Sequence, residues 1–155
     1  MEQARPTVSV LLLRAGGWPF AVDVGRVADL LRPARLEPAS AARPGLLGYA
    51  TFAGGPLAVL DLAPFVGVSR RAAPDGPAAA GGRVLVLRAG AGLLGLWVDA
   101  GGQVAELTPA DCAAEPIGEL GGPSWSVGLC RVRGHWHALL DVRALEALLA
   151  GRAPA

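Results

Sequence analysis

The stretch Gly48-Tyr-Ala-Thr-Phe-Ala-Gly-Gly-Pro-Leu-Ala-Val-Leu-Asp-Leu62 predicts a β-hairpin. Apolar residues lie on both sides of Gly54-Gly55-Pro56, and glycine and proline are the residue types that form tight turns. We expect one strand to rise to Ala53 and a second, more apolar strand to end at Asp61. This hairpin is the local structure that the sequence indicates most clearly.

The same plan occurs again in Gly128-Leu-Cys-Arg-Val-Arg-Gly-His-Trp-His-Ala-Leu-Leu-Asp-Val142. Five residues of the first stretch return 80 positions later (128 − 48 and 141 − 61 agree): Gly48, Gly54, Ala58, Leu60 and Asp61 correspond to Gly128, Gly134, Ala138, Leu140 and Asp141. Residues 10–16 (VLLLRAG) are likewise echoed by residues 84–90 (VLVLRAG). The chain is therefore predicted to be a duplication of one β-rich unit of about 60 residues, too small for a self-sufficient core.

Segments on either side of the first hairpin have distinct patterns. The apolar run Val8–Arg14 and the segment Trp18–Val22 are predicted strands joined by a glycine turn. In Val24–Leu31 the apolar residues fall at helical spacing, so we expect a short helix with Asp23 as its N-cap. Ser69–Gly82 contains no large apolar residue and is a predicted linker.

The C-terminal end is predicted to be an amphipathic helix over Val142–Leu149, with Asp141 as its N-cap. Short strands, glycine turns and brief helices together indicate a mainly β protein of two small five-stranded barrels packed together. We expect one domain over residues 1–155, with a first barrel at 8–68, the linker at 69–82, and a second barrel with the C-terminal helix at 83–150.

Composition excludes several functions. All 14 basic residues of the 155 are arginine, which removes lysine-based covalent chemistry, and a net charge of +1 gives little support to nucleic-acid binding. The chain has no apolar run near the ~20 residues of a spanning helix, so membrane insertion is not expected. Since Val8–Leu13 is too short for the apolar core of a signal peptide, we expect a cytoplasmic protein.

Four aspartates close apolar runs at equivalent places: Asp23, Asp61, Asp99 and Asp141. Two of them paired as acid and base would suggest catalysis. Their symmetric placement favours capping and turn roles instead, and no other motif in the sequence suggests a reaction.

Histidines cluster only at His135-Trp136-His137, where strand alternation places both imidazoles on one face. They suit a metal ion if Asp141 or Cys130 supplies a third ligand, which makes a small metal-dependent enzyme the hypothesis from a different functional class. The alternative is a solvated hairpin tip, and we expect no cofactor.

Other chemistry-bearing residues are few. Cys112 and Cys130 lack CxxC spacing and are expected to be free, buried thiols. Trp97 lies in an apolar run and is expected in the core, whereas Trp125 and Trp136 are better candidates for an interface.

The duplicated hairpin resembles the signature of the CheW family of chemotaxis coupling proteins, which has a Gly-x-Ile-Asn-Leu-Arg-Gly strand and turn followed by a Pro-Val-x-Asp-Leu strand. Residues 48–54 and 58–62 are similar to it, and Val-Ala-Asp-Leu-Leu at 27–31 resembles the family's Val-x-Glu-Val-Leu segment. The resemblance covers about residues 8 to 150. It implies two SH3-like barrels and a non-catalytic adaptor that bridges the cytoplasmic tip of a methyl-accepting chemoreceptor and the regulatory domain of a CheA-type histidine kinase, which shares this fold.

Matched residue by residue, the family's partner-binding surface falls on seven positions of this sequence: Val27, Asp29, Leu30, Gly48, Thr51, Ala53 and Gly54. One departure is notable, because Ala53 stands where the family has its arginine, a residue suited to charge-assisted contacts with a partner. An Arg-Gly pair occurs instead in the second copy, at Arg133-Gly134. Two hypotheses follow: a coupling protein with altered interface chemistry, or an accessory adaptor that retains only one partner.

Overall fold

The computed structural model describes residues 7–15, 18–32, 36–37, 45–62, 82–90, 92–113 and 126–149. Most of the predicted linker at 69–82, and Trp125, lie outside the described residues. The first part of the chain forms β1 (Val8–Ala15), β2 (Trp18–Asp23), a 3-10 turn η1 (Val24–Arg26), β3 (Val27–Leu31), β4 (Leu46–Phe52) and β5 (Gly55–Leu60). The second part forms β6 (Arg83–Ala89), β7 (Gly92–Val98), β8 (Ala100–Leu107), a 3-10 turn η4 (Pro109–Asp111), β9 (Cys112–Ala113), β10 (Ser126–Val132), β11 (His135–Leu140) and the helix α1 (Val142–Leu149).

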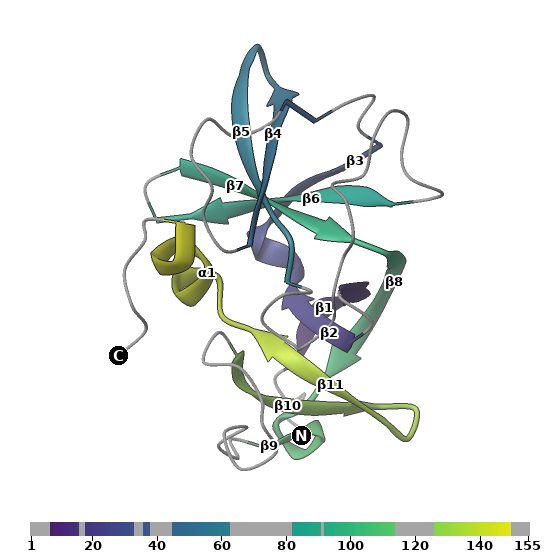
Figure 1. Cartoon of the computed structure of the whole chain (residues 1–155). Helices are drawn as coiled ribbons and strands as arrows, with labels where there is room; N and C mark the ends of the chain where they lie inside the picture. The colour runs from purple at the N-terminus through teal and green to yellow at the C-terminus, as the bar shows by residue number, and fades with distance from the viewer. Residues whose placement is uncertain are drawn as a thin grey trace.

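These strands form two sheets, as the mainly β prediction requires (Figure 1). Sheet A has six strands in the order β8-β1-β2-β11-β10-β9, and sheet B has five in the order β3-β6-β7-β5-β4. Each sheet contains one parallel pair, β11 with β2 in sheet A and β5 with β7 in sheet B. Helix α1 follows β11 directly, and its predicted position is confirmed.

The predicted division into a first barrel at 8–68 and a second at 83–150 is wrong. Strands β1 and β2 pair with β8 and β11 in sheet A, whereas β6 and β7 pair with β3 and β5 in sheet B. The two copies of the unit have therefore exchanged their first two strands. The repeat identifies equivalent strands, but β1 and β6 have such similar residues that the sequence does not reveal which copy each will join.

The apolar runs of β1 and β6 are continuous because these strands are buried on both faces. On β6, Val84 and Val86 belong to the apolar cluster of sheet B that contains Trp97. Leu85 and Leu87, which alternate with them, belong to a different cluster that lies between the sheets. Strand alternation thus distributes one apolar run over two cores.

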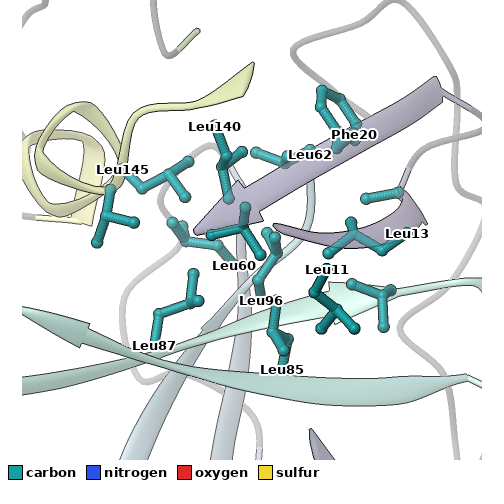
Figure 2. Packing of buried hydrophobic residues seen from close by; sticks show 14 of the residues in the cluster. Leu11, Leu13, Phe20, Leu60, Leu62, Leu85, Leu87, Leu96, Leu140 and Leu145 are labelled. Carbon is teal, nitrogen blue, oxygen red and sulfur yellow. The ribbon is translucent and has the colours of Figure 1, made fainter. Parts of the chain in front are cut away.

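The core between the sheets takes residues from both of them and from α1 (Figure 2). Its labelled members are Leu11, Leu13, Phe20, Leu60, Leu62, Leu85, Leu87, Leu96, Leu140 and Leu145. Each is at most 9% exposed, so the two sheets form one packed unit. The two sheets share this cluster, in agreement with the small size of the repeating unit.

The predicted helix over Val24–Leu31 is wrong beyond its first turn. Only Val24–Arg26 is helical, as a 3-10 turn, and Val27–Leu31 is strand β3. β3 pairs with β6 through a bulge between Val27 and Asp29. The extra residue, Ala28, shifts the strand alternation and produces a spacing that resembles a helical one. Asp23 caps the short turn nevertheless, since its Oδ1 accepts a hydrogen bond from the Gly25 backbone N at 2.9 Å.

The first hairpin is confirmed, but its turn lies one residue earlier than predicted. Phe52 pairs with Gly55, so Ala53 and Gly54 form a two-residue loop and Gly55 already belongs to β5. At the other end of the chain, Asp141 caps α1 as expected. Its Oδ1 accepts hydrogen bonds from the backbone N of Arg143 at 3.1 Å and of Ala144 at 3.4 Å.

Candidate functional site

Strand β3 carries three of the seven residues expected at a partner surface. Within the described strands it pairs only with β6, so it is an edge strand of sheet B. Val27 is half-buried, whereas Asp29 is exposed and Leu30 is 37% exposed. Consecutive strand residues point to opposite faces, so the edge exposes a carboxylate on one face and an apolar side chain on the other. An amphipathic partner that packs along the edge can reach both groups.

The Asp29 carboxylate also contributes to the local structure. Its Oδ1 accepts a hydrogen bond from the Leu30 backbone N at 2.8 Å. The bond occupies a backbone donor of the edge strand and fixes the direction of the Asp29 side chain. Since a carboxylate has several acceptor sites, the exposed group keeps further capacity for a donor on a partner.

Arg88 holds the start of β3 in place. Its guanidinium Nη1 donates to the carbonyl oxygen of Val27 at 2.7 Å and of Gly25 at 3.3 Å. Arg88 lies on β6, 61 residues further along the chain than Val27, so local sequence patterns do not reveal this role. The sequence does hint at a structural role for this arginine, because Arg14 and Arg88 occupy equivalent positions in the two copies of the repeat.

The β4–β5 hairpin carries three more of the expected residues, Thr51, Ala53 and Gly54, and all three are exposed. Ala53 has φ of 52° and Gly54 has φ of 83°. Two central residues with positive φ define a type I′ turn, the loop that matches the twist of a tight hairpin. The backbone thus presents the Ala53 side chain at an exposed tip.

Gly48 differs from the other six, because it is buried. It lies at a bulge in the β4–β5 pairing with φ of 152°, and a Cβ there would overlap the backbone oxygen of Glu37. Glu37 and Tyr49 exchange two backbone hydrogen bonds at this point, of 2.7 and 2.8 Å. The geometry assigns Gly48 to the close packing beneath the hairpin and not to its exposed surface.

The exposed residues form two groups on one sheet. β3 and β4 lie at opposite ends of the strand order of sheet B, with β6, β7 and β5 between them. Beneath them is one apolar cluster around Trp97, to which Ala28 and Leu31 of β3 and Phe52 of β4 contribute. Trp97 is 2% exposed, which confirms its predicted core position.

Two of the four aspartates and both histidines have contacts that the structure defines. Asp23 and Asp141 accept backbone N–H groups, as capping residues do. His137 Nδ1 lies 3.2 Å from the His135 carbonyl oxygen. No three His, Cys, Asp or Glu side chains among the described residues are arranged to hold a metal ion.

The second hairpin has a polar surface of its own. His135, His137 and Arg133 line a cavity of about 480 Å³ together with Trp136, Arg14, Gln103, Leu12, Pro19 and Val132. Trp136 is 48% exposed, and the Arg131 guanidinium lies 5.7 Å from the centre of its ring. Trp136 thus lies at the surface beside a cation, and its role at an interface stays a prediction.

Within the described residues, no helix combines the length and the hydropathy required to span a membrane. A comparison with curated proteins gives no match. Among solved structures, the scaffolding protein TtCheW from Thermoanaerobacter tengcongensis is similar, with a TM-score of 0.76 at 13% sequence identity over 94% of this chain and 91% of that one. At this identity the likeness shows the fold. The family model of the CheW-like domain matches residues 9–148, and the chain therefore belongs to the CheW-like domain family.

Proposed function

We propose that this chain is a non-catalytic coupling scaffold of chemotaxis-like signalling. It holds the cytoplasmic tip of a chemoreceptor beside the regulatory domain of a CheA-type histidine kinase, so that the state of the receptor biases the kinase. The observation that supports this most strongly is the CheW-like domain match over residues 9–148, nearly the whole two-sheet fold. Both partners act in the cytoplasm, which is where we place the protein.

The proposed partner surface consists of the exposed part of β3 and the tip of the β4–β5 hairpin. Asp29 supplies a charge and Leu30 an apolar contact, while Thr51 and Ala53 lie at the exposed hairpin. Helical partners bind through an apolar stripe with charged residues beside it, and this surface offers the complementary groups. Gly48 contributes by shaping the hairpin from below.

Ala53 favours a second hypothesis, that of an accessory adaptor with only one partner. Alanine has no donor for a carboxylate or carbonyl group of a partner, whereas arginine has five. If Ala53 faces one partner and not the other, only that interface loses a charge-assisted contact.

Binding of the purified protein to its cognate kinase and to a receptor fragment, measured separately, distinguishes these hypotheses. Binding of both supports the coupling scaffold, and binding of one supports the accessory adaptor. Binding of neither contradicts both. Kinase activity with and without receptor, in the presence of the protein, then tests whether bound partners are coupled.

The duplication supplies a matched control for the surface. Asp29 on β3 and Glu106 on β8 are equivalent exposed acids of the two copies. Asp29→Arg is expected to weaken partner binding at least tenfold, because it reverses a charge within the proposed surface. Glu106→Arg makes the same charge change on sheet A and is expected to leave binding unchanged. Equal losses in both variants would place the interface elsewhere or indicate a purely long-range effect of charge.

A further inference from the structure

The chain has two cysteines in 155 residues, and the fold places them directly opposite each other. Cys112 of β9 and Cys130 of β10 are register partners in an antiparallel pair. Both are free thiols, with Cys112 exposed and Cys130 buried. Nothing in the sequence pattern predicts this pairing, since the two residues are 18 positions apart (130 − 112) and lack CxxC spacing.

The two side chains lie on the same face of sheet A. Directly opposed residues of antiparallel strands point to one side of the sheet. Cys130 packs in a small cluster with Val10, Ala21 and Leu107. Cys112 lines an apolar cavity of about 310 Å³ to which the same three residues contribute. Cys130 therefore packs against residues that line the cavity, and the Cys112 Sγ lies at the cavity wall, 3.7 Å from the Thr108 carbonyl oxygen.

Electrostatics agrees with this proximity. The pKa of the Cys130 thiol is raised to about 11, first by burial and then by the nearby Cys112 and Asp111. The charge of Cys112 acts on Cys130 because the two groups are close.

The backbone separation also suits a covalent link. Opposed residues in antiparallel strands have Cα atoms about 4.5 Å apart in a non-hydrogen-bonded pair and about 5.5 Å apart in a hydrogen-bonded pair. Disulfides span Cα separations of about 4.4–6.8 Å. Either kind of pair lies within this range, so a bond requires rotation of the side chains and little movement of the strands.

We propose that Cys112 and Cys130 are an oxidation-sensitive dithiol that forms a reversible disulfide when the protein meets a peroxide. The exposed Cys112 reacts first. Its thiolate attacks one oxygen of hydrogen peroxide, the O–O bond breaks, and the departing hydroxide takes a proton and leaves as water. Cys112 is then a sulfenic acid.

Cys130 completes the disulfide. Its sulfur attacks the Cys112 sulfur, the S–O bond breaks, and the S–S bond forms. The hydroxide that leaves takes the Cys130 proton and becomes a second water, so one peroxide accepts two electrons and two protons in total. This step is the slower one, because the buried Cys130 is a thiol at neutral pH. Thiol–disulfide exchange with a dithiol reductant reverses the reaction.

The bond would restrain a weakly held part of the fold. β9 has two residues, lies at the end of sheet A and is connected to β10 by two register pairs. η4, which precedes it, lines the apolar cavity through Pro109. A Cys112–Cys130 disulfide fixes β9 to β10 and with it one wall of this cavity.

The test uses the full chain, treated with hydrogen peroxide and then with a thiol-blocking reagent. We expect free thiols to fall from two per chain to none, and a dithiol reductant to restore both. Cleavage after arginine leaves both cysteines in one peptide, so cleavage after glutamate is added, because Glu119 lies between them. The resulting Cys112 and Cys130 peptides are expected to be linked and to separate on reduction.

Variants and hydrogen exchange sharpen the test. Cys112→Ser is expected to leave Cys130 unreacted, whereas Cys130→Ala is expected to leave Cys112 as a sulfenic or sulfinic acid. Oxidation of the unaltered chain is expected to slow amide exchange in β9 at least tenfold. Sulfinic acid at Cys112 with a free Cys130 in the unaltered chain, disulfides only between chains, or no reaction would each overturn the proposal.

Discussion

Ala53 and Arg133 have the same backbone conformation, with φ of 52° and 50°. Each is the first residue of a two-residue hairpin loop, and Gly54 and Gly134 follow with φ of 83° and 80°. One loop belongs to sheet B and the other to sheet A. The duplication thus preserved a left-handed conformation at two positions, neither of which is glycine. The side chains at these positions differ in chemistry, since one is a methyl group and the other a guanidinium.

Replacing Ala53 with asparagine is expected to stabilise the protein. The left-handed conformation costs an alanine about 1–2 kcal/mol, whereas asparagine followed by glycine is the preferred pair of a type I′ turn. We expect a gain of about 0.5–1 kcal/mol in the free energy of unfolding, measured by urea denaturation. Thr51→Asn, in the extended part of β4, is the control and is expected to give no gain. An unchanged stability of Ala53→Asn would mean that the turn does not carry this strain.

Ala53→Arg is expected to strengthen partner binding under the proposed function. Arg133 shows that an arginine is accommodated at this place in the turn. A new charge-assisted contact of about 1.4 kcal/mol corresponds to a tenfold lower Kd. Binding of the kinase domain and of the receptor fragment by calorimetry gives the result, and Ala53→Gln is the uncharged control. An unchanged Kd for both partners would place the interface away from this hairpin.

Gly48→Ala is expected to destabilise the fold. A side chain there requires an unfavourable positive φ and meets the Glu37 carbonyl oxygen, which belongs to the backbone and cannot rotate away. We expect a loss of roughly 1–3 kcal/mol in the free energy of unfolding. Gly55→Ala is the matched control, since a Cβ at that position would meet no atom within 4 Å beyond its chain neighbours. Weaker partner binding by Gly48→Ala at full stability would instead indicate a direct contact.

Arg88→Met is expected to loosen the start of β3. The variant loses both hydrogen bonds to backbone carbonyls, which we expect to cost about 1 kcal/mol because the group is exposed. Amide exchange at Val27–Leu31 is expected to accelerate more than elsewhere in sheet B. Arg26→Met removes the same charge from the neighbouring exposed turn and serves as the control. Equal acceleration in both variants would show that charge, and not the two bonds, is responsible.

The carboxyl of Asp111 is expected to titrate below its usual range. Its Oδ2 accepts the Thr108 backbone N–H at 2.8 Å and the Thr108 hydroxyl at 3.0 Å, and these bonds, in that order, lower its pKa from 3.8. The resulting stability is present above the unfolded pKa and is lost as pH falls through the folded pKa. Thr108→Val retains the backbone donor, so the pKa should rise only partway in an NMR titration. No rise would exclude a role for the hydroxyl.

The family motif and the repeat were sufficient to place most of the strands, the C-terminal helix and both caps. They failed at Val24–Leu31, where a bulge at Ala28 produces an apolar spacing like that of a helix. They also missed the contact of Arg88 with Val27, because bonds between distant strands leave no periodic trace. Of the seven expected site residues, Gly48 is the one that the structure removes from the exposed surface.

Local patterns were enough to identify a duplicated β protein with paired hairpins, because turn residues and apolar alternation are properties that each segment carries. The pairing of the two copies is visible only in the folded chain, since β1 and β6 present nearly the same residues to either sheet. The same pairing brought Cys112 opposite Cys130 and Arg88 beside Val27. Such contacts depend on strand register across the whole fold, which no single stretch of sequence specifies.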